Sequence, residues 1–400
     1  MKHRIVVLGA GYAGANAAGR LARKLHRDDV EITLVNADPD FVERVRMHQL
    51  AVGQELRLRP LRDVLAGTGV AVRTARVTAV DVDHRVVDLV DPHGGPDRTS
   101  TDRIGYDTLI YALGSVAADS GVPGVAEHAH VVASRAGALR LRERLLDLAA
   151  GGTVVVVGGG LTGIEAVTEI AESRPDLHVA LAARGELGDW LGERARHFLR
   201  RTFDRLRITV HEHADVTAVD AAGVATAAGG WIPADVTVWT GGFVAHPLAA
   251  ATSLELADNG QVVVDASMRS VSHPDVYVVG DAAFAAGAGG APLRMSCASG
   301  VPTAWRAADA VAARLTGRRV PDAPIGYTGQ CISLGRGAGI LQFVAPDDTV
   351  RAAAITGGLG ARIKELVCSS AAWSVSHPTM MLPSRRRRIV AAPADHPVSV

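Results

Sequence analysis

A short apolar run that leads into a glycine-rich turn constrains the fold of this chain most. Residues 4–9 read RIVVLG, which has the length and apolar character of a buried strand. Residues 14–26 carry small residues and helix formers, and residues 30–36 (VEITLVN) read as a second strand. A strand, a glycine-rich turn, a helix and a further strand together predict a βαβ unit that binds a dinucleotide.

The same pattern recurs about 150 residues later along the chain. Residues 153–158 (TVVVVG) predict a strand, residues 159–173 predict a turn and a helix, and residues 177–183 (LHVALAA) predict the next strand. Two such units indicate two dinucleotide-binding halves rather than a short-period repeat. We therefore predict an α/β protein with two Rossmann-like domains.

The two turns read GAGYAG at residues 9–14 and GGGLTG at residues 158–163. In such a turn the first glycine allows the tight connection, the second lets the backbone approach a pyrophosphate, and the third lets helix and strand pack closely. The N-terminus of the following helix offers free N–H groups and the positive end of its dipole. Both turns are therefore predicted to bind phosphate groups.

The end of the second strand in each unit is where an acidic residue would accept the hydroxyls of a ribose. The first unit has Asn36 there, which can still bond a ribose but has no charge, and Asp38 is a possible substitute. The second unit has Ala183 followed by Arg184. A small residue followed by Arg suits a 2′-phosphate, which favours NADPH. The alternative is that Arg184 is a surface residue and either nicotinamide cofactor is used.

Composition excludes several classes of protein. The 400 residues suggest two or three domains, and 42 basic residues balance 42 acidic ones, which argues against a nucleic-acid binder. Lysine occurs at three positions only, because nearly all basic residues are Arg. The three cysteines form no CxxC pair, so neither a zinc ribbon nor any other metal site is predicted. No secretory segment or membrane-spanning apolar run is present, and we expect a cytoplasmic protein.

Other segments give coarser predictions. Residues 70–90 and 208–240 alternate apolar and polar residues, which predicts antiparallel strands, and residues 91–103 read as a hairpin tip. Residues 361–373 predict one short helix. The tail from about residue 385, with its four arginines, is predicted to be disordered.

The order of the motifs resembles a known family. GAGYAG is followed by YDTLIYALGS, GGGLTGIEA, VWTGGF and VYVVGDAA, as in the FAD-dependent pyridine nucleotide oxidoreductases of the glutathione-reductase-like fold. The chain looks closest to the type II NADH dehydrogenases, over residues 3–370. The resemblance implies an FAD-binding domain at 1–118 and 262–325, an inserted NAD(P)-binding domain at 119–261, and a small α+β region at 326–400.

The resemblance also implies a set of cofactor-binding residues. For FAD these are the residues of the first turn and of the later FAD-facing motifs: Gly9, Gly11, Tyr12, Ala13, Gly14, Asn36, Arg44, Val77, Ala112, Gly114, Gly280 and Asp281. Val77 would bind the adenine through its backbone, and Asp281 the ribityl chain. For the nicotinamide cofactor they are Gly158, Gly160, Gly163, Arg184 and Gly241.

Two residues are candidates for a catalytic role. Glu165, in GIEA, would lie near the nicotinamide and the flavin, where such a Glu aligns the nicotinamide and relays protons; the alternative is a first-turn residue that satisfies the helix dipole. His48 lies in FVERVRMHQ, a segment that in the family runs under the flavin. It would bond the flavin, act as a general acid or base, or be linked to FAD covalently. The alternative is a polar helix that packs its Met and Leu inward.

The departures from the family limit the reaction. Residues 40–60 lack the CxxxxC of the disulfide reductases, and the inserted domain lacks the CxxC of thioredoxin reductases, so disulfide reduction is excluded. Residues 295–302 lack the glutamine-rich stretch where quinone meets flavin in type II NADH dehydrogenases.

We therefore predict an enzyme that passes hydride from NAD(P)H to FAD and on to a quinone, an electron carrier or a small molecule. The alternative is a flavin oxidase or dehydrogenase that takes electrons from its own substrate. We expect at most peripheral contact with a membrane, at its inner face. The sequence leaves open whether the protein forms a homodimer.

Overall fold

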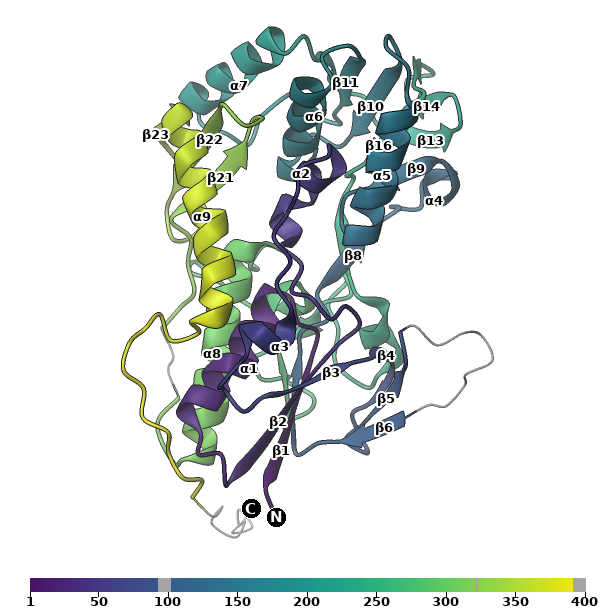
Figure 1. The fold of residues 1–400 in the computed structure, drawn as a ribbon. Coiled ribbons are helices and arrows are strands. Elements are labelled where there is room, and N and C mark those ends of the chain that lie inside the picture. The colour runs from purple at the N-terminus through teal and green to yellow at the C-terminus, as the bar shows by residue number, and fades with distance from the viewer. Residues whose placement is uncertain (93–101, 321–322, 391–400) are drawn as a thin grey trace.

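The computed structural model describes residues 1–92, 102–320 and 323–390. Its lower lobe holds a parallel sheet with the strand order β19-β7-β1-β2-β3 (Figure 1). The strands are β1 (His3–Leu8), β2 (Val30–Asn36), β3 (Ala71–Thr74), β7 (Thr108–Tyr111) and β19 (Val276–Val278). Helix α1 (Tyr12–Lys24) packs against α8 (Cys297–Leu315), and both belong to one large apolar core with the sheet.

The upper lobe repeats this plan with the parallel strand order β12-β11-β10-β16-β9. Its strands are β9 (Ala129–Val131), β10 (Thr153–Val157), β11 (His178–Ala182), β12 (Thr209–His211) and β16 (Val236–Trp239). Its helices are α4 (Val125–His128), α5 (Arg135–Asp147), α6 (Leu161–Ser173) and α7 (Glu193–Arg205). The prediction of two Rossmann-like domains is confirmed.

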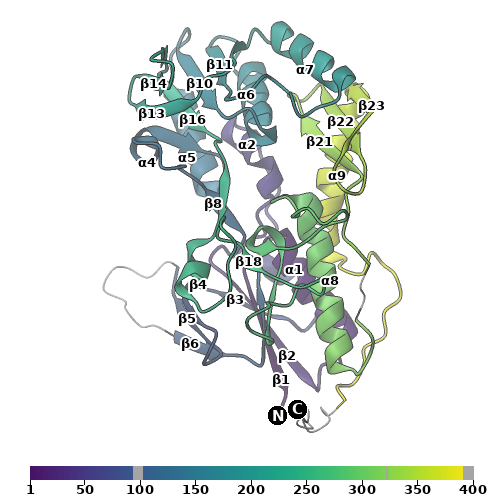
Figure 2. The same cartoon turned by 180° about the vertical axis from the view of Figure 1, so that it is seen from behind.

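The chain enters and leaves the upper lobe side by side. Strand β8 (Ser115–Ala117) leads upward and pairs antiparallel with β17 (Phe243–Ala245), which leads back (Figure 2). The segments that follow β17 are η2 (Pro247–Ala251), β18 (Val262–Val263), η3 (Gly280–Ala282) and β20 (Ala283–Phe284). The upper lobe is thus inserted in the lower one, as the motif order implies.

The alternating segments form small antiparallel sheets only in part, because β3 joins the parallel sheet of the lower lobe and β12 and β16 join that of the upper lobe. The small antiparallel sheets are β4 (Arg76–Asp81), β5 (Val86–Val90) and β6 (Asp102–Gly105), and β13 (Val216–Asp220), β14 (Gly223–Thr226) and β15 (Trp231–Pro233). The predicted hairpin tip falls mostly on residues 93–101, outside the described residues.

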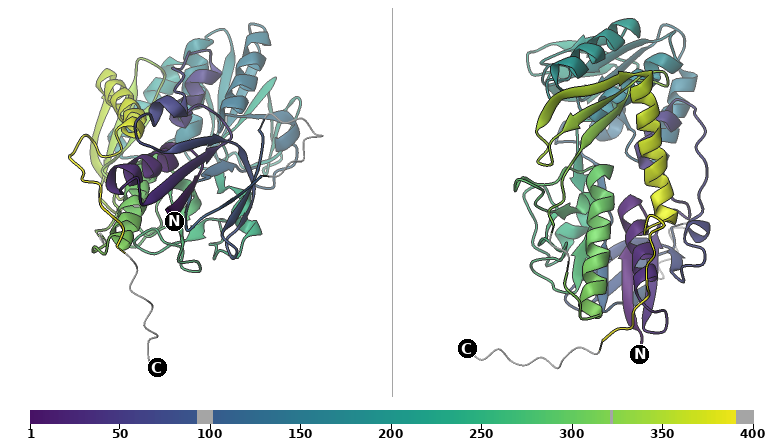
Figure 3. Two further views of the ribbon diagram at one scale, coloured as in Figure 1. Left: turned by 60° about the horizontal axis from the view of Figure 1, so that its bottom comes forward. Right: turned by 90° about the vertical axis from the view of Figure 1, so that its left-hand side faces the viewer.

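The C-terminal region is one layer that spans both lobes. Strands β21 (Gly329–Ser333), β22 (Gly339–Val344) and β23 (Val350–Gly357) form an antiparallel sheet beside α7 and α6. Helix α9 (Gly358–Ser376) follows, longer than the short helix predicted, and runs down the side of the molecule from this sheet to α1 (Figure 3). It therefore contacts both dinucleotide-binding lobes.

The segment after β2 crosses between the lobes. After η1 (Arg44–Arg46), the short helix α2 (Met47–Ala51) lies against α5 and α6, and α3 (Leu61–Val64) follows on the way back. Met47, Leu50 and Ala51 are buried in the core of the upper lobe. The inward packing of Met and Leu, one of the two interpretations of this segment, is therefore confirmed, although it is the inserted lobe that receives them.

The prediction of a disordered tail from about residue 385 is wrong for the first six residues. Arg387 forms a parallel bridge with Leu25, and Arg388 pairs with Asp28 at 3.1 Å and with Asp29 at 2.8 Å. Arg386 donates to the carbonyl oxygen of Ala22 near the end of α1, so a helix carbonyl and two carboxylates hold this stretch. The last ten residues lie outside the described part of the chain.

Candidate functional site

The first glycine-rich turn has the geometry that binding a pyrophosphate requires. Gly9 has φ +90°, and a Cβ there would lie 2.4 Å from the carbonyl oxygen of Ala112. A Cβ on Gly14 would lie 1.8 Å from the carbonyl oxygen of Gly9. Gly11, by contrast, faces open space, with no heavy atom within 4 Å of a Cβ. The turn therefore packs closely on its inner side and leaves the N-terminus of α1 open to a phosphate.

The side chains beside this turn mostly serve the fold. Asn36 Oδ1 accepts the N–H of Ala10 at 2.9 Å, and Asn36 Nδ2 donates to the carbonyl oxygen of Asp38 at 2.7 Å. The amide thus braces the turn from the end of β2, and its contact with a ribose stays a prediction. The ring of Tyr12 is buried edge-on to Phe41, and its hydroxyl has no hydrogen-bond partner among the described residues.

Three predicted FAD residues meet where the lobes join. Asp281 Oδ2 accepts the hydroxyl hydrogen of Ser115 at 2.6 Å, and the same oxygen lies 3.7 Å from the guanidinium of Arg44. Arg44 donates to Ser115 Oγ at 3.1 Å, and its guanidinium lies 3.8 Å from the Cβ position of Gly114. Burial lowers the pKa of Arg44, and Asp281 offsets this. A fixed carboxylate and a cation thus lie together at the end of β7.

The remaining predicted FAD residues lie around these groups. Gly280 has φ +69°, and its Cβ position is 3.0 Å from Ala13 on the first turn. Ala112 follows β7 directly, and Val77 lies on β4 next to a register shift in its pairing with β5. The binding role of each stays a prediction.

The second turn repeats the main features of the first. Gly158 has φ +118°, and a Cβ on Gly163 would lie 1.9 Å from the carbonyl oxygen of Gly158. Gly160 faces open space at the N-terminus of α6. A Cβ built on Gly241 would lie 2.7 Å from the ring of Trp239, which would have to shift to admit a larger residue. The upper lobe therefore has a second turn with this open geometry, and its contact with a phosphate stays a prediction.

Arg184 does not reach a buried position beside this turn. Its side chain is 82% exposed and pairs with Asp215 at 3.1 Å. Asp215 is itself 53% exposed. A carboxylate therefore lies beside the cation that was expected to attract a 2′-phosphate, which weakens the argument for NADPH.

The two predicted catalytic residues meet in a buried cluster between the lobes. Glu165 Oε2 lies 3.7 Å from His48 Nδ1, and Glu165 Oε1 accepts the backbone N–H of Ser333 at 2.9 Å. Lys364, from α9, lies 2.8 Å from Glu165 Oε1. The Glu165 side chain is thus committed to the C-terminal layer, and does not serve as a cap of α6.

Protonation in the cluster follows from burial and charge. The pKa of His48 is lowered to about 4, because burial, with a smaller contribution from Lys364, outweighs Glu165, which raises it. The imidazole is therefore neutral at pH 7 and cannot start as a charged acid. Burial lowers the pKa of Lys364 as well, but Glu165 outweighs this and holds that pKa above its usual value. His48 Nε2 is buried with no hydrogen-bond partner among the described residues.

Sequence reasoning missed Lys364 and the groups that hold its surroundings. The available signal was its rarity, since it is one of three lysines in a chain that otherwise uses Arg. Arg46 was also missed: it pairs with Glu43 at 3.0 Å and Glu365 at 2.5 Å, and so ties η1 to α9. No local pattern marks such long-range pairs.

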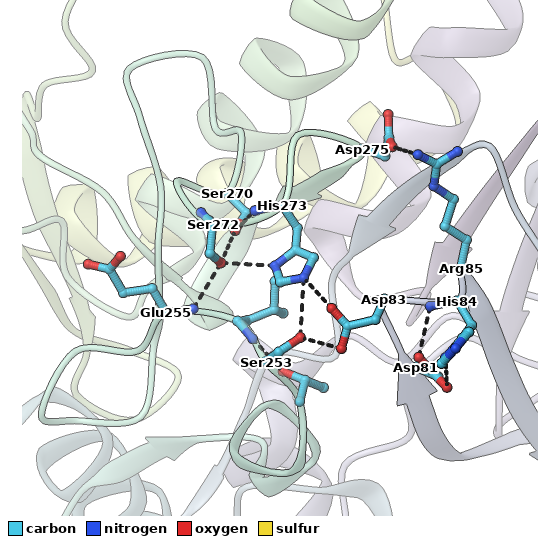
Figure 4. A network of polar contacts seen from close by, with 12 residues as sticks. Asp81, Asp83, His84, Arg85, Ser253, Glu255, Ser270, Ser272, His273 and Asp275 are labelled. Carbon is cyan, nitrogen blue, oxygen red and sulfur yellow. Dashed lines mark hydrogen bonds and ion pairs between the residues drawn. The ribbon is translucent and has the colours of Figure 1, made fainter.

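A serine, a histidine and an aspartate also meet on the lower lobe, but not as a catalytic triad (Figure 4). Ser253 Oγ and Asp83 Oδ1 both contact the same ring nitrogen, His273 Nε2, at 3.2 and 3.0 Å. In a catalytic triad the hydroxyl and the carboxylate bind opposite ring nitrogens. Together with the Arg85–Asp275 pair at 2.6 Å, this network fastens the β4–β5 turn to the loop before β19.

Comparison with known proteins places these features in a family. The family model described as pyridine nucleotide-disulphide oxidoreductase matches residues 3–311. The chain is 33% identical over 308 residues to the NADH dehydrogenase-like protein MT1860 of Mycobacterium tuberculosis, covering 70% of this chain and 73% of that protein. It is 27% identical over 356 residues to the demethylphylloquinone reductase NdbB of Synechocystis sp., covering 84% and 86%.

Among solved structures, NDH2 from Plasmodium falciparum in complex with NADH superposes with a TM-score of 0.79 at 14% identity, over 95% of this chain and 97% of that one. Two open glycine turns and an orphaned buried imidazole nitrogen fit the cofactors of this family. The chain therefore belongs to the pyridine nucleotide-disulphide oxidoreductase family, and is a flavoprotein NAD(P)H oxidoreductase whose cofactors are FAD and a nicotinamide nucleotide.

Proposed function

We propose that the protein passes electrons from NADH to a quinone. The observation that carries the proposal is the buried cluster of Glu165, His48 and Lys364 beside the second glycine turn. The names of relatives add support, since one is a demethylphylloquinone reductase. When bound, FAD supplies the two-electron chemistry that links nicotinamide and acceptor.

The residues of the chain would position the two cofactors and manage protons. The turn at Gly9–Gly14 and the helix α1 would hold the FAD pyrophosphate, and the turn at Gly158–Gly163 the nicotinamide phosphates. Asp281 would bind the ribityl hydroxyls, with Arg44 and Ser115 fixing its orientation. His48 Nε2, which is buried without a partner among the described residues, would form a hydrogen bond with the flavin or the acceptor.

NADH is the donor that the second lobe favours. A carboxylate near the adenosine ribose accepts hydroxyl hydrogens and repels a 2′-phosphate. Asp215 supplies such a carboxylate beside Arg184. We infer that Arg184 and Asp215 together give little preference for NADPH.

The quinone would arrive along α9 from a lipid surface. Within the described residues no helix is long and apolar enough to cross a membrane. However, large apolar side chains are exposed along α9 and the turn that follows it: Leu359, Leu366, Val367, Trp373, Met380, Met381 and Leu382. Because α9 also presents Lys364 inward, its outer face would rest on lipid while its inner face lines the cluster.

An anaerobic experiment in two steps tests the proposal. The purified holoprotein is first titrated with NADH and, separately, with NADPH, and the flavin absorbance is followed. The reduced protein is then mixed with a soluble quinone. We expect bleaching by NADH and full recovery with quinone. A protein that NADH does not bleach would instead fit the alternative, an oxidase or dehydrogenase reduced by its own substrate.

A further inference from the structure

A second buried glutamate lies one turn beyond Glu165 on α6. Glu169 has no exposed surface. Its Oε2 accepts a hydrogen bond from Gln54 Nε2 at 3.0 Å, while its Oε1 has no hydrogen-bond partner among the described residues. The nearest cation, Arg336 Nη1, lies 4.0 Å from Oε1, which is too far for a hydrogen bond.

The groups that face Glu169 stabilise its charge too little to offset its burial. On α6 itself Glu165 and Glu172 add negative charge. From the β21–β22 turn comes Arg336, which is half-exposed and also lies 3.7 Å from Glu365. The segment after α2 contributes only the neutral Gln54. Burial and the two glutamates outweigh Arg336 and Gln54, and raise the pKa of Glu169 to about 7.

The position of Glu169 connects the buried cluster with solvent. Residues four apart lie on the same face of a helix, so Glu169 is the direct neighbour of Glu165. On its other side lies Glu172, which accepts the backbone N–H of Arg336. Arg336 is 49% exposed. A chain of polar groups therefore leads from Glu169 through Glu172 toward the surface at Arg336.

We propose that Glu169 holds a proton in the resting enzyme and reloads Glu165 when the acceptor is reduced. The proposal rests on the proposed quinone acceptor. NADH delivers two electrons and one proton as hydride, whereas a quinone takes up two electrons and two protons, so one proton must come from water. That proton moves from Glu169 to Glu165 and on to the quinone oxygen, and water protonates Glu169 again. Because Glu169 acts through Glu165, it is a positioning residue.

The first test separates the two half-reactions. Glu169→Gln keeps the side-chain volume but cannot release a proton. Its matched control is Glu193→Gln, an exposed glutamate on α7. We expect flavin reduction by NADH to change less than about two-fold in both variants. Reoxidation by a soluble quinone should slow by about ten-fold or more in Glu169→Gln only, and its pH profile should lose the inflection near pH 7.

The second test needs no turnover. A carboxyl whose pKa is raised in the folded state binds a proton that the unfolded chain has lost, so stability falls as pH rises from the unfolded pKa of about 4.5 toward 7. Glu169→Gln has no carboxyl at this position and does not lose stability in this way. The melting temperature of Glu169→Gln minus that of the wild type should therefore rise over this window and level off above it. The difference for Glu193→Gln should stay flat.

Gln54→Leu provides a second variant in case Glu169→Gln does not fold with FAD. It removes the one hydrogen bond to the charged carboxylate, so the inflection should move to higher pH. A wild type that NADH bleaches but quinone does not reoxidise would overturn the acceptor and the relay together. Normal quinone turnover with an unchanged pH profile in Glu169→Gln, or a flat melting-temperature difference, would overturn the role of Glu169 alone.

Discussion

The helices that follow the two glycine turns begin alike and then diverge. Two residues after the last glycine, α1 carries Asn16 and α6 carries Glu165, and both side chains contact α9. Asn16 donates to Ser374 Oγ at 3.2 Å, a bond between neutral groups. Glu165 pairs with Lys364 at 2.8 Å. The same position in the two lobes is thus neutral in one and ionic in the other.

The divergence continues one turn further. Arg20 on α1 pairs with Asp309 on α8 at 2.7 Å, whereas Glu169 on α6 has no cation within hydrogen-bonding distance. The first lobe thus satisfies its charges locally and can serve as a rigid support. The second lobe keeps unusual charges buried beside α9, which natural proteins tolerate chiefly at functional sites. The repeated fold therefore serves two different tasks.

The largest expected effect comes from removing the cation of the ionic contact. Lys364→Met leaves Glu165 buried without its partner, and should lower the free energy of unfolding by about 3–5 kcal/mol. The matched change in the neutral contact, Ser374→Ala, should cost about 1 kcal/mol. Denaturant unfolding of both holoproteins checks this. Equal losses would mean that the two contacts with α9 are energetically alike.

A pH effect should mark the second lobe next. The pKa of His48 is lowered to about 4, so below pH 6.5 the unfolded chain binds a proton that the folded protein refuses, and stability falls as pH drops from 6.5 toward 4. The wild type should lose about 3 kcal/mol of unfolding free energy over that window, and His48→Asn should not. Melting temperatures between these pH values give the slope. A variant with the wild-type slope would show that His48 titrates normally.

Alanine in the two turns should separate the cofactors. A Cβ on Gly14 or on Gly163 meets a backbone carbonyl oxygen at less than 2 Å, so each costs about 1–3 kcal/mol. Gly163→Ala should keep its yellow FAD while its Kd for NADH rises about 5- to 150-fold. Gly14→Ala should release FAD on dialysis. A Gly163→Ala protein that loses FAD first would contradict the assignment of the lobes.

The smallest effect is expected at Arg184. Because its exposed side chain pairs with an exposed Asp215, Arg184→Ala should change the kcat/KM for NADH less than about two-fold. Asp215→Asn should instead improve the use of NADPH, because it removes the repulsion of a 2′-phosphate. Steady-state rates with both cofactors measure this. A large loss with NADPH in Arg184→Ala would restore the original preference inferred from the sequence.

Most of the fold could be predicted because the glycine turns and apolar strands are local signals. The bounds of β2 agree to the residue, and α6 lies within its predicted range. The contact of α2 with the upper lobe could not be predicted, since only tertiary packing decides which core receives Met47 and Leu50. Lys364 was missed for the same reason, because about 200 residues separate it from Glu165. The bracing of the first turn by the Asn36 amide was also missed, and the contact of Asn36 with a ribose stays a prediction.

Anaerobic rapid mixing tests the central claim most directly, namely that two nucleotide-binding lobes feed electrons to a quinone through one flavin. The oxidised holoprotein is mixed with NADH, and the reduced protein is then mixed with a soluble quinone in a second shot. The account predicts rapid loss of the flavin absorbance followed by its full return in step with the disappearance of quinone. A flavin that NADH leaves oxidised, or that quinone leaves reduced, would contradict it.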